Sequence, residues 1–174
     1  MIKLECENNL ILETITNYLD YKNYFVGSQN ERYQTIIKIY ETDKSIKLDV
    51  NGNITDLALP LDINLLASEI LKIIIDININ FGNFKYFPYQ RLVTNFKKKS
   101  LLSDIQNIII SNLLVSKEGM DKNFLYQSIW KRDKTISINK LDTHLTNLKN
   151  KLMLDLDLKI NFQSQNKMLR LLIN

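Results

Sequence analysis

SIWKRDKTISINKLDTHLTNLKNKL, residues 128–152, is the stretch that decides the fold. It contains the chain's only tryptophan, continues as a polar connection, and ends in a helical pattern. Leucines recur there at the spacing of one helix face, on a helix that begins at Ser137 or Asn139 and runs to about Met153. The leucines of this face are Leu141, Leu145, Leu148 and Leu152. The outer surface of the same helix would carry Lys140, Thr143, His144, Asn147 and Lys151.

Two further helices precede this one, at 103–116 and 121–130, each with an inward-facing apolar stripe. A β-hairpin follows it, with strands at 156–162 and 168–173 around a turn at 163–167. Upstream, the strand-like segments are 84–87, 91–96 and 100–102. Three helices followed by a hairpin is the order of a winged helix-turn-helix, whose third helix enters the DNA major groove.

The first half of the chain has a different pattern, in which short strands alternate with two helices. The strands are expected at 1–6, 24–26, 34–40, 45–50 and 54–59, and the helices at 8–20 and 62–76. This pattern predicts an α/β domain over residues 1–80, followed by an α+β domain over 81–174. The helix at 62–76 is apolar on more than one face, so we expect a homodimer that forms through residues 1–80.

Composition excludes several classes of protein. Cys6 is the only cysteine, so neither an intramolecular disulfide framework nor a cysteine-based zinc site can form. The first residues have no apolar core of a signal peptide, and no apolar run is long enough to span a bilayer. We therefore expect a cytoplasmic protein without a membrane segment.

Charge is distributed unevenly along the chain. Residues 1–83 contain 7 basic and 12 acidic side chains, whereas residues 84–174 contain 16 basic and 7 acidic ones. An acidic half joined to a basic half indicates that the second half binds a polyanion.

Residues 84–172 resemble the C-terminal effector domain of OmpR/PhoB-type response regulators. FLYQSIW resembles the second helix of that family, and KLDTHLTNLKNKL resembles its recognition helix. The number of residues from Trp130 to Asp142 is the same as in the family, so the two helices align without a gap. The resemblance implies a winged-helix DNA-binding domain with a recognition helix at about 138–153.

The chain departs from this family at the recognition helix and at the wing. Asn139, Thr146 and Asn147 stand where the family usually has arginines, which implies fewer bidentate guanine contacts. Asn147 could still pair with an adenine edge and Thr143 could contact a thymine methyl, so an AT-rich target is expected. At the wing, QNKML at 165–169 replaces the family's glycine-containing end.

The first half resembles a shortened, degenerate receiver domain. LALPLDINLLASEILKII, residues 57–74, resembles the last strand and helix of a receiver, with Leu59 in place of the usual lysine. Glu5 and Glu7 stand where receivers keep acidic metal ligands, and Asp49 ends a strand as a phosphoacceptor would. The segment between Asp49 and Leu59 is too short for a full receiver, so we expect no regulation by phosphorylation.

These patterns together predict a DNA-binding transcriptional regulator rather than an enzyme, with no cofactor, no catalytic group and no metal site. The sequence shows no nucleophile paired with a base that could activate it. His144, the only histidine, is not part of a group of residues that could form a catalytic or metal site. The run 97–99 is either a solvated turn or a phosphate contact. The alternative function is a protein-interaction module that has lost DNA binding and contacts RNA polymerase or a histidine-kinase-like partner. The expected contacts to double-stranded DNA are Asn139, Lys140, Thr143, His144, Asn147, Lys149, Lys151, Lys167 and Arg170.

Overall fold

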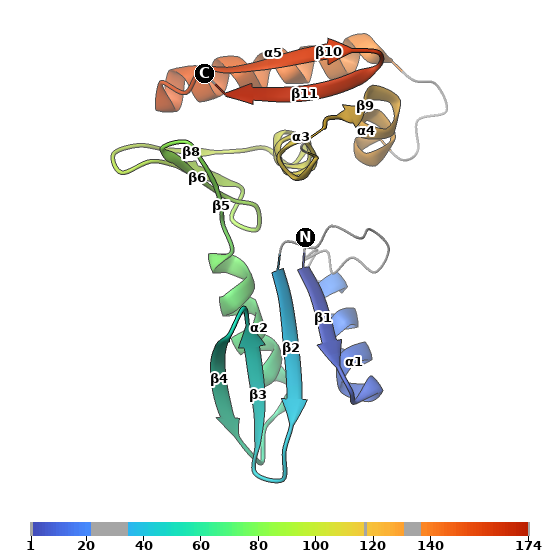
Figure 1. The fold of residues 1–174 in the computed structure, drawn as a ribbon, viewed down its shortest axis with the longest axis vertical. Coiled ribbons are helices and arrows are strands. Elements are labelled where there is room, and N and C mark those ends of the chain that lie inside the picture. The colour runs from blue at the N-terminus through green and yellow to red at the C-terminus, as the bar shows by residue number, and fades with distance from the viewer. Residues whose placement is uncertain (1, 22–34, 117, 131–136, 174) are drawn as a thin grey trace. The chain divides into compact units, whose positions relative to one another are not determined.

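The computed structural model describes residues 2–21, 35–116, 118–130 and 137–173 (Figure 1). It is a mixed α/β structure with two compact units, Met1–Ile77 and Asn78–Asn174. This division lies earlier than the expected boundary after residue 80, because strand β5 (Ile79–Phe81) pairs with β6 of the second unit. In the described residues, no helix is long and apolar enough to cross a membrane.

The first unit is a four-stranded sheet with two helices. Its strands lie in the order β1-β2-β3-β4; β1 and β2 are parallel, whereas β2, β3 and β4 form an antiparallel meander. Asn8 caps the first helix by accepting the backbone N–H of Leu10 and Ile11, and Asp62 caps the second through Asn64. The elements are β1 (Ile2–Cys6), α1 (Asn9–Tyr21), β2 (Thr35–Glu41), β3 (Ser45–Val50), β4 (Asn53–Ala58) and α2 (Ile63–Asp76).

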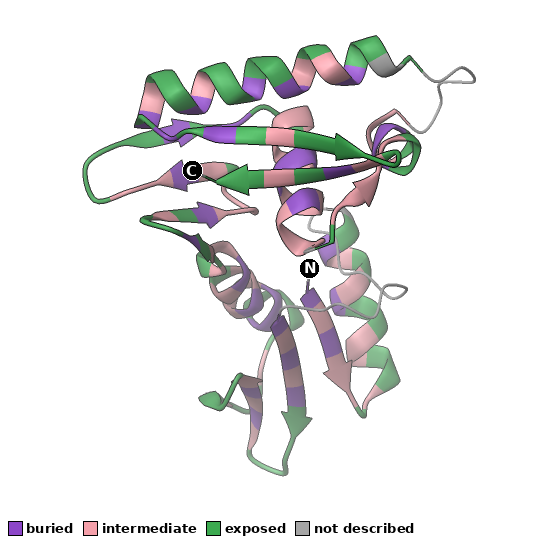
Figure 2. Ribbon diagram, turned by 45° about the horizontal axis from the view of Figure 1, so that its top comes forward, coloured by how far each residue is buried: buried purple, intermediate pink, exposed green. Residues whose placement is uncertain are grey.

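One face of this sheet is buried, because strand residues alternate between the core and solvent (Figure 2). Ile37 and Leu48 on the buried face are fully inaccessible, as are Ile15 of α1 and Ile70 of α2. Both helices lie on this one side of the sheet (Figure 1). The other face carries partly exposed charged side chains such as Lys38 and Lys47.

The topology of the first unit differs from the receiver that the sequence suggested. A receiver is a doubly wound sheet of parallel strands, whereas here only β1 and β2 are parallel. Asp49 lies in the antiparallel strand β3, and Leu59 follows the edge strand β4 rather than a central parallel strand. Short turns join β2 to β3 and β3 to β4, so these strands pair as consecutive hairpins and run antiparallel. The strand expected at 24–26 lies outside the described residues.

The second unit begins with an antiparallel meander, in the order β5-β6-β7-β8, and continues with three helices and a hairpin. The hairpin strand β11 also pairs with the short strand β9, which lies between the first two helices. The helices and the hairpin follow in the order expected from the sequence. After β5, the elements are β6 (Phe84–Phe87), β7 (Leu92–Thr94), β8 (Lys99–Leu101), α3 (Asp104–Val115), β9 (Met120–Asp121), α4 (Lys122–Ile129), α5 (Ile138–Leu156), β10 (Ile160–Gln165) and β11 (Met168–Ile173).

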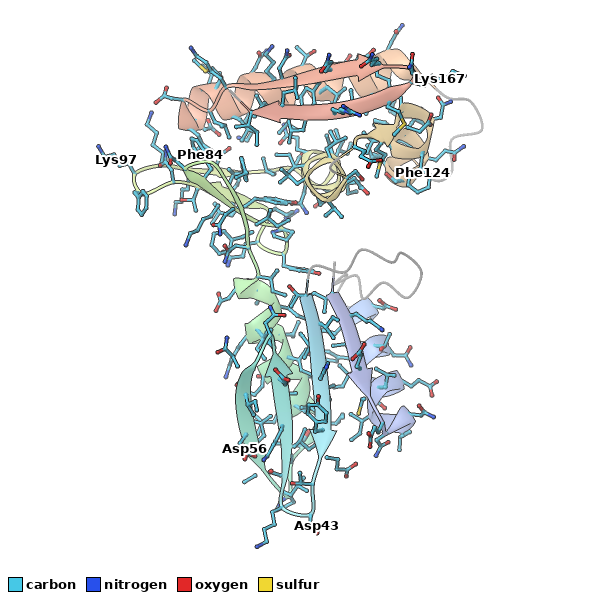
Figure 3. The ribbon with its side chains drawn as sticks, viewed as in Figure 1. Asp43, Asp56, Phe84, Lys97, Phe124 and Lys167 are labelled. Carbon is cyan, nitrogen blue, oxygen red and sulfur yellow. The ribbon has the colours of Figure 1, made fainter. Side chains whose placement is uncertain are left out.

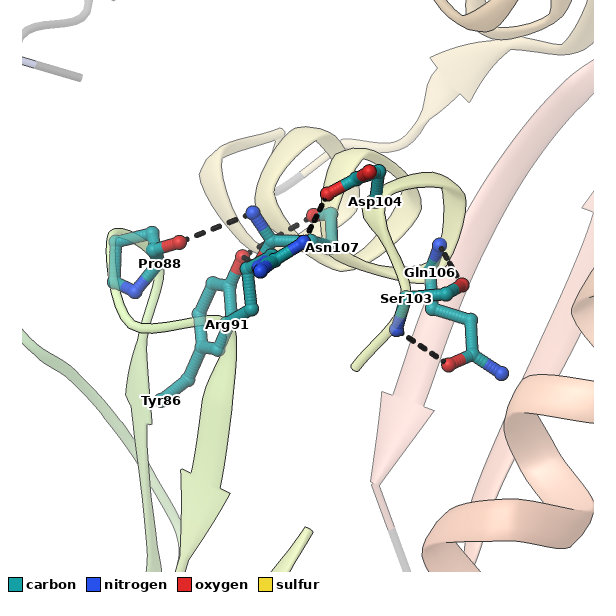
Figure 4. A network of polar contacts seen from close by, with 7 residues as sticks. All are labelled: Tyr86, Pro88, Arg91, Ser103, Asp104, Gln106 and Asn107. Atoms are coloured by element: carbon teal, nitrogen blue, oxygen red, sulfur yellow. Dashed lines mark hydrogen bonds and ion pairs between the residues drawn. The ribbon is translucent and has the colours of Figure 1, made fainter. Parts of the chain in front are cut away.

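A polar network joins the meander to the start of α3 (Figure 4). Ser103 and Gln106 form a reciprocal capping box, as expected from Ser103. The hydroxyl of Tyr86 donates to Asn107 Oδ1 at 2.6 Å, and Asn107 Nδ2 donates to the carbonyl of Pro88 at 3.0 Å. Burial raises the pKa of Tyr86, so its hydroxyl stays a donor at neutral pH. This network fixes α3, against which the other two helices pack.

Candidate nucleic-acid interface

Helix α5 is anchored by the leucine stripe that the sequence predicted. Leu141, Leu148 and Leu152 are fully inaccessible and Leu145 is 4% exposed. They belong to one core cluster with Ile109, and Trp130 packs against that cluster. Burial of this stripe fixes which side of α5 faces outward.

The outer face of α5 is polar and uncharged. Its exposed side chains include Asn139, Thr143, Thr146, Asn147 and Asn150. The hydroxyls of Thr143 and Thr146 donate to the carbonyls one turn earlier, both at 2.9 Å. These two hydroxyls are therefore directed at the backbone of α5 itself, whereas the asparagine amides of this face can both donate and accept hydrogen bonds. Such a face suits base edges better than phosphates.

The flank of α5 that meets α4 is formed by a cation and aromatic rings. Lys140 Nζ lies 4.3 Å from the ring centroid of Trp130 and 6.0 Å from that of Tyr126. His144 packs against the same indole, with ring centroids 5.4 Å apart. The sequence placed His144 on the outer surface of the helix, whereas in the structure its ring is half-buried and in contact with Trp130.

The opposite flank of α5 forms a shallow groove of about 270 Å³ with the hairpin β10–β11. Lys122, at the start of α4, is paired with Asp142 across this groove at 3.1 Å. Lys149 Nζ lies 3.4 Å from Asn161 Oδ1, and Ser164 adds a hydroxyl to the lining. The charge of Lys122 is matched by Asp142, so Lys149 and the Ser164 hydroxyl are the groups of this groove that can bind phosphate oxygens.

The turn at the tip of the hairpin β10–β11 is formed without glycine. Asn166 and Lys167 both have positive φ, 49° and 65°, as a two-residue turn of this kind requires. Asparagine is among the residues that tolerate this conformation best. The carbonyl of Lys167 accepts the backbone N–H of Lys122 at 3.0 Å, which ties the tip to the start of α4. The exposed side chain of Lys167 extends from this tip (Figure 3).

Lys151 and Arg170, which were also expected to contact DNA, have charged or carbonyl partners within the chain. Lys151 pairs with Asp155 one turn further along α5, at 2.9 Å. Arg170 Nε donates to the carbonyl of Glu118 at 2.7 Å, beside the turn that leads into β9. The structure thus brings Asn139, Thr143 and Asn147 to one face, whereas Lys151 and Arg170 make internal contacts.

Sequence reasoning missed Lys122 and Ser164 as members of this surface. Lys122 lies twenty residues before Asp142, on a different helix, so no helical periodicity connects them. The pairing of β10 with β11 brings Ser164 to the groove. A basic residue at the first position of the second helix was the only local signal.

Comparisons with known proteins give limited information. No protein-family model matches the chain, and no curated protein matches it. Among solved structures, it is similar to the C-terminal domain of the nisin resistance regulator NsrR, a lantibiotic response regulator. The two are 26% identical, the match covers 52% of this chain and 93% of that one, and the TM-score is 0.42. At this TM-score the match carries no weight for function, which rests on the geometry of α5 and its flanks.

Proposed function

We propose that residues 78–174 form a winged helix of the OmpR/PhoB type that binds double-stranded DNA sequence-specifically, and that the protein is a transcriptional regulator. The observation that carries this proposal is the uncharged outer face of α5, between a basic groove and an aromatic flank. Asn139, Thr143 and Asn147 lie on that face. An exposed helix followed by a β-hairpin is the arrangement that enters a major groove.

Each part of the surface has a distinct role in this proposal. Asn147 would bind an adenine edge through its amide, and the Thr143 methyl would contact thymine. Lys149 in the groove and Lys167 at the hairpin tip would neutralise phosphates on either side. The basic balance of residues 84–174, 16 basic against 7 acidic side chains, supports attraction to DNA as a whole.

Phosphorylation does not control this binding in our proposal. The side chain of Asp49 accepts the backbone N–H of Gly52 at 2.8 Å, so it caps the turn between β3 and β4. The described residues contain no cluster of three or more acidic, histidine or cysteine side chains that could hold a metal ion. Phosphoryl transfer to a carboxylate needs such a cation to neutralise developing charge.

A protein-interaction module remains the second proposal, and a different observation favours it. Phe124 on α4 is 54% exposed and Leu154 on α5 is 80% exposed, both in the same unit as the uncharged face. Exposed apolar side chains suit a protein partner, such as RNA polymerase.

Titration of fluorescent duplexes with the full chain distinguishes the two proposals. We expect binding to AT-rich duplexes whose affinity falls steeply between a low and a high salt concentration. Lys149→Gln should reduce both the affinity and its salt dependence, whereas Lys44→Gln, at an exposed position in the first unit, should change neither. Absence of salt-dependent binding to any duplex would overturn the DNA proposal.

A further inference from the structure

The tip between β7 and β8, residues 95–99, exposes an aromatic ring among lysines. Phe96 is 100% exposed, and lysines follow it at 97, 98 and 99. All three lysine side chains are exposed as well, and Lys97 lies on this tip (Figure 3). The core of the second unit makes no use of this ring, which is available to an outside partner.

Four hydrogen bonds fix the conformation of the β7–β8 tip. Asn95 Oδ1 accepts the backbone N–H of Lys97 at 2.9 Å and that of Lys98 at 2.7 Å. The carbonyl of Lys98 accepts the backbone N–H of Asn95 at 3.0 Å and the hydroxyl of Thr94 at 2.9 Å. Phe96 is thus presented by a closed turn, so binding through its ring costs little conformational entropy.

The β7–β8 tip is tied to the C-terminal end of α5. Lys98 pairs with Asp157, the C-cap residue of that helix. The hairpin tip at Lys167 is tied instead to Lys122, which pairs with Asp142 in the N-terminal half of α5. Two basic tips therefore lie toward opposite ends of the helix that we propose to bind a major groove.

The β7–β8 tip has a net positive charge. Lys97 and Lys99 make no ion pair with any residue that the structure describes. The two carboxylates at this end of α5 are compensated, because Asp157 is paired as described above and Asp155 pairs with Lys151 at 2.9 Å. The charge of the tip is therefore complementary to a polyanion.

We propose that the β7–β8 tip is a second contact to double-stranded DNA, in which Phe96 enters a minor groove and Lys97 and Lys99 bind the phosphates beside it. This inference rests on the proposed binding of α5 in the adjacent major groove. Proteins that bind the minor groove frequently insert an apolar side chain such as phenylalanine between base steps, and use lysine or arginine beside it. An exposed ring with two unpaired lysines has this chemistry.

The length of α5 fits this second contact. A recognition helix contacts base edges with its N-terminal residues, and on α5 the exposed residues there include Asn139, Thr143 and Asn147. At a rise of 1.5 Å per residue, Asp157 lies about 15 Å beyond Asn147 along the helix axis. The major groove is about 12 Å wide, so the C-terminal end of a helix that crosses it extends past the bordering phosphates. The surface of DNA beyond those phosphates is the neighbouring minor groove.

Titration of duplexes with the full chain at several salt concentrations tests the ring and the lysines separately. Phe96→Ala should weaken binding about tenfold at every salt concentration, because it removes apolar contact area without removing charge. Combined Lys97→Gln and Lys99→Gln should lower the salt slope by about two. Leu10→Ala, at a position on α1 that is 74% exposed, is the matched control and should change neither affinity nor slope.

Hydroxyl-radical footprinting locates the contact, because the cleavage reports the exposure of sugars along the minor groove. The wild type should protect a stretch beside the α5 site that Phe96→Ala leaves open, while the rest of the footprint is retained. Wild-type binding with unchanged affinity, slope and footprint in the variants would overturn the tip contact alone. Absence of binding to any duplex would overturn the proposed function as well. Binding to anionic phospholipid vesicles that Phe96→Ala abolishes, with DNA binding unchanged, would assign the tip to a membrane surface instead.

Discussion

Lys140 lies with its ammonium 4.3 Å from the ring centroid of Trp130, so the first turn of α5 is held against the C-cap residue of α4. Lys140, which we expected among the DNA contacts, is thus also a structural contact. A cation over an indole face is attracted by the ring quadrupole. This pair connects the orientation of α5 with the surface that would meet DNA.

Lys140→Ala should therefore have two effects. Loss of the cation–π contact should lower the free energy of unfolding by about 0.5–1 kcal/mol. Loss of the charge should weaken binding to all DNA sequences and lower the salt slope by about one. Urea unfolding, followed by the fluorescence of Trp130, the sole tryptophan, measures the free energy of unfolding. DNA binding at several salt concentrations measures the salt slope. Lys140→Arg should preserve both, and an unchanged salt slope in Lys140→Ala would exclude this residue from the phosphate contacts.

Asn147→Ala should affect specificity rather than general affinity. The exposed amide lies on the uncharged face, where it would pair with a base edge. Its removal should cost roughly 1–3 kcal/mol on the preferred duplex and little on random DNA. Competition binding with both duplexes at one salt concentration provides the comparison. An equal loss on both would show that Asn147 does not read sequence.

Leu145→Ala should destabilise the second unit by about 2–5 kcal/mol, because it leaves a cavity beneath α5. Leu145 is 4% exposed. Leu154 provides the matched control on the same helix, since it is 80% exposed, and Leu154→Ala should change stability by no more than about 0.5 kcal/mol. Denaturant unfolding of both variants tests this, and similar losses would mean that the leucine stripe is not the core contact.

The sequence was sufficient to predict helix α5 and its buried face, because Leu141 and Leu148 lie at helical spacing and this signal is local. The start of α3 near residue 103 was predicted for the same reason, whereas the reciprocal bond from Gln106 came from the structure. Strand β5 was missed because three residues, Ile79–Phe81, contain too short an alternation to detect. The antiparallel direction of β4 follows locally from the two-residue turn at Asn51 and Gly52. The pairing of Lys122 with Asp142 depends instead on a tertiary contact between distant segments, which residue patterns do not encode.

Asp155 should contribute to the pH dependence of stability. Ser100 Oγ donates to Asp155 Oδ2 at 2.6 Å, and this hydrogen bond, with Lys151 nearby, lowers the pKa of Asp155. A carboxylate with a lowered folded-state pKa stabilises the fold above its unfolded pKa of about 3.9. That contribution is lost as the pH falls through the lowered folded-state value. Unfolding of the wild type and of Asp155→Asn across the acid range should show a shallower pH dependence in the variant, and identical slopes would contradict this.

Incubation with a small-molecule phosphodonor and Mg²⁺ should leave the protein unmodified. Asp49 lies in an antiparallel strand, and its carboxylate caps the turn at Gly52. A carboxylate that accepts a phosphoryl group needs a bound cation and an oxygen that lies in line with the donor. Intact mass measures the outcome directly. Asp49→Asn is the matched variant, because an asparagine oxygen can still accept the Gly52 N–H. Both proteins should retain their mass and should bind DNA equally well with and without the donor. A stoichiometric phosphoryl adduct that is present in the wild type and lost in Asp49→Asn would instead establish regulation by phosphorylation.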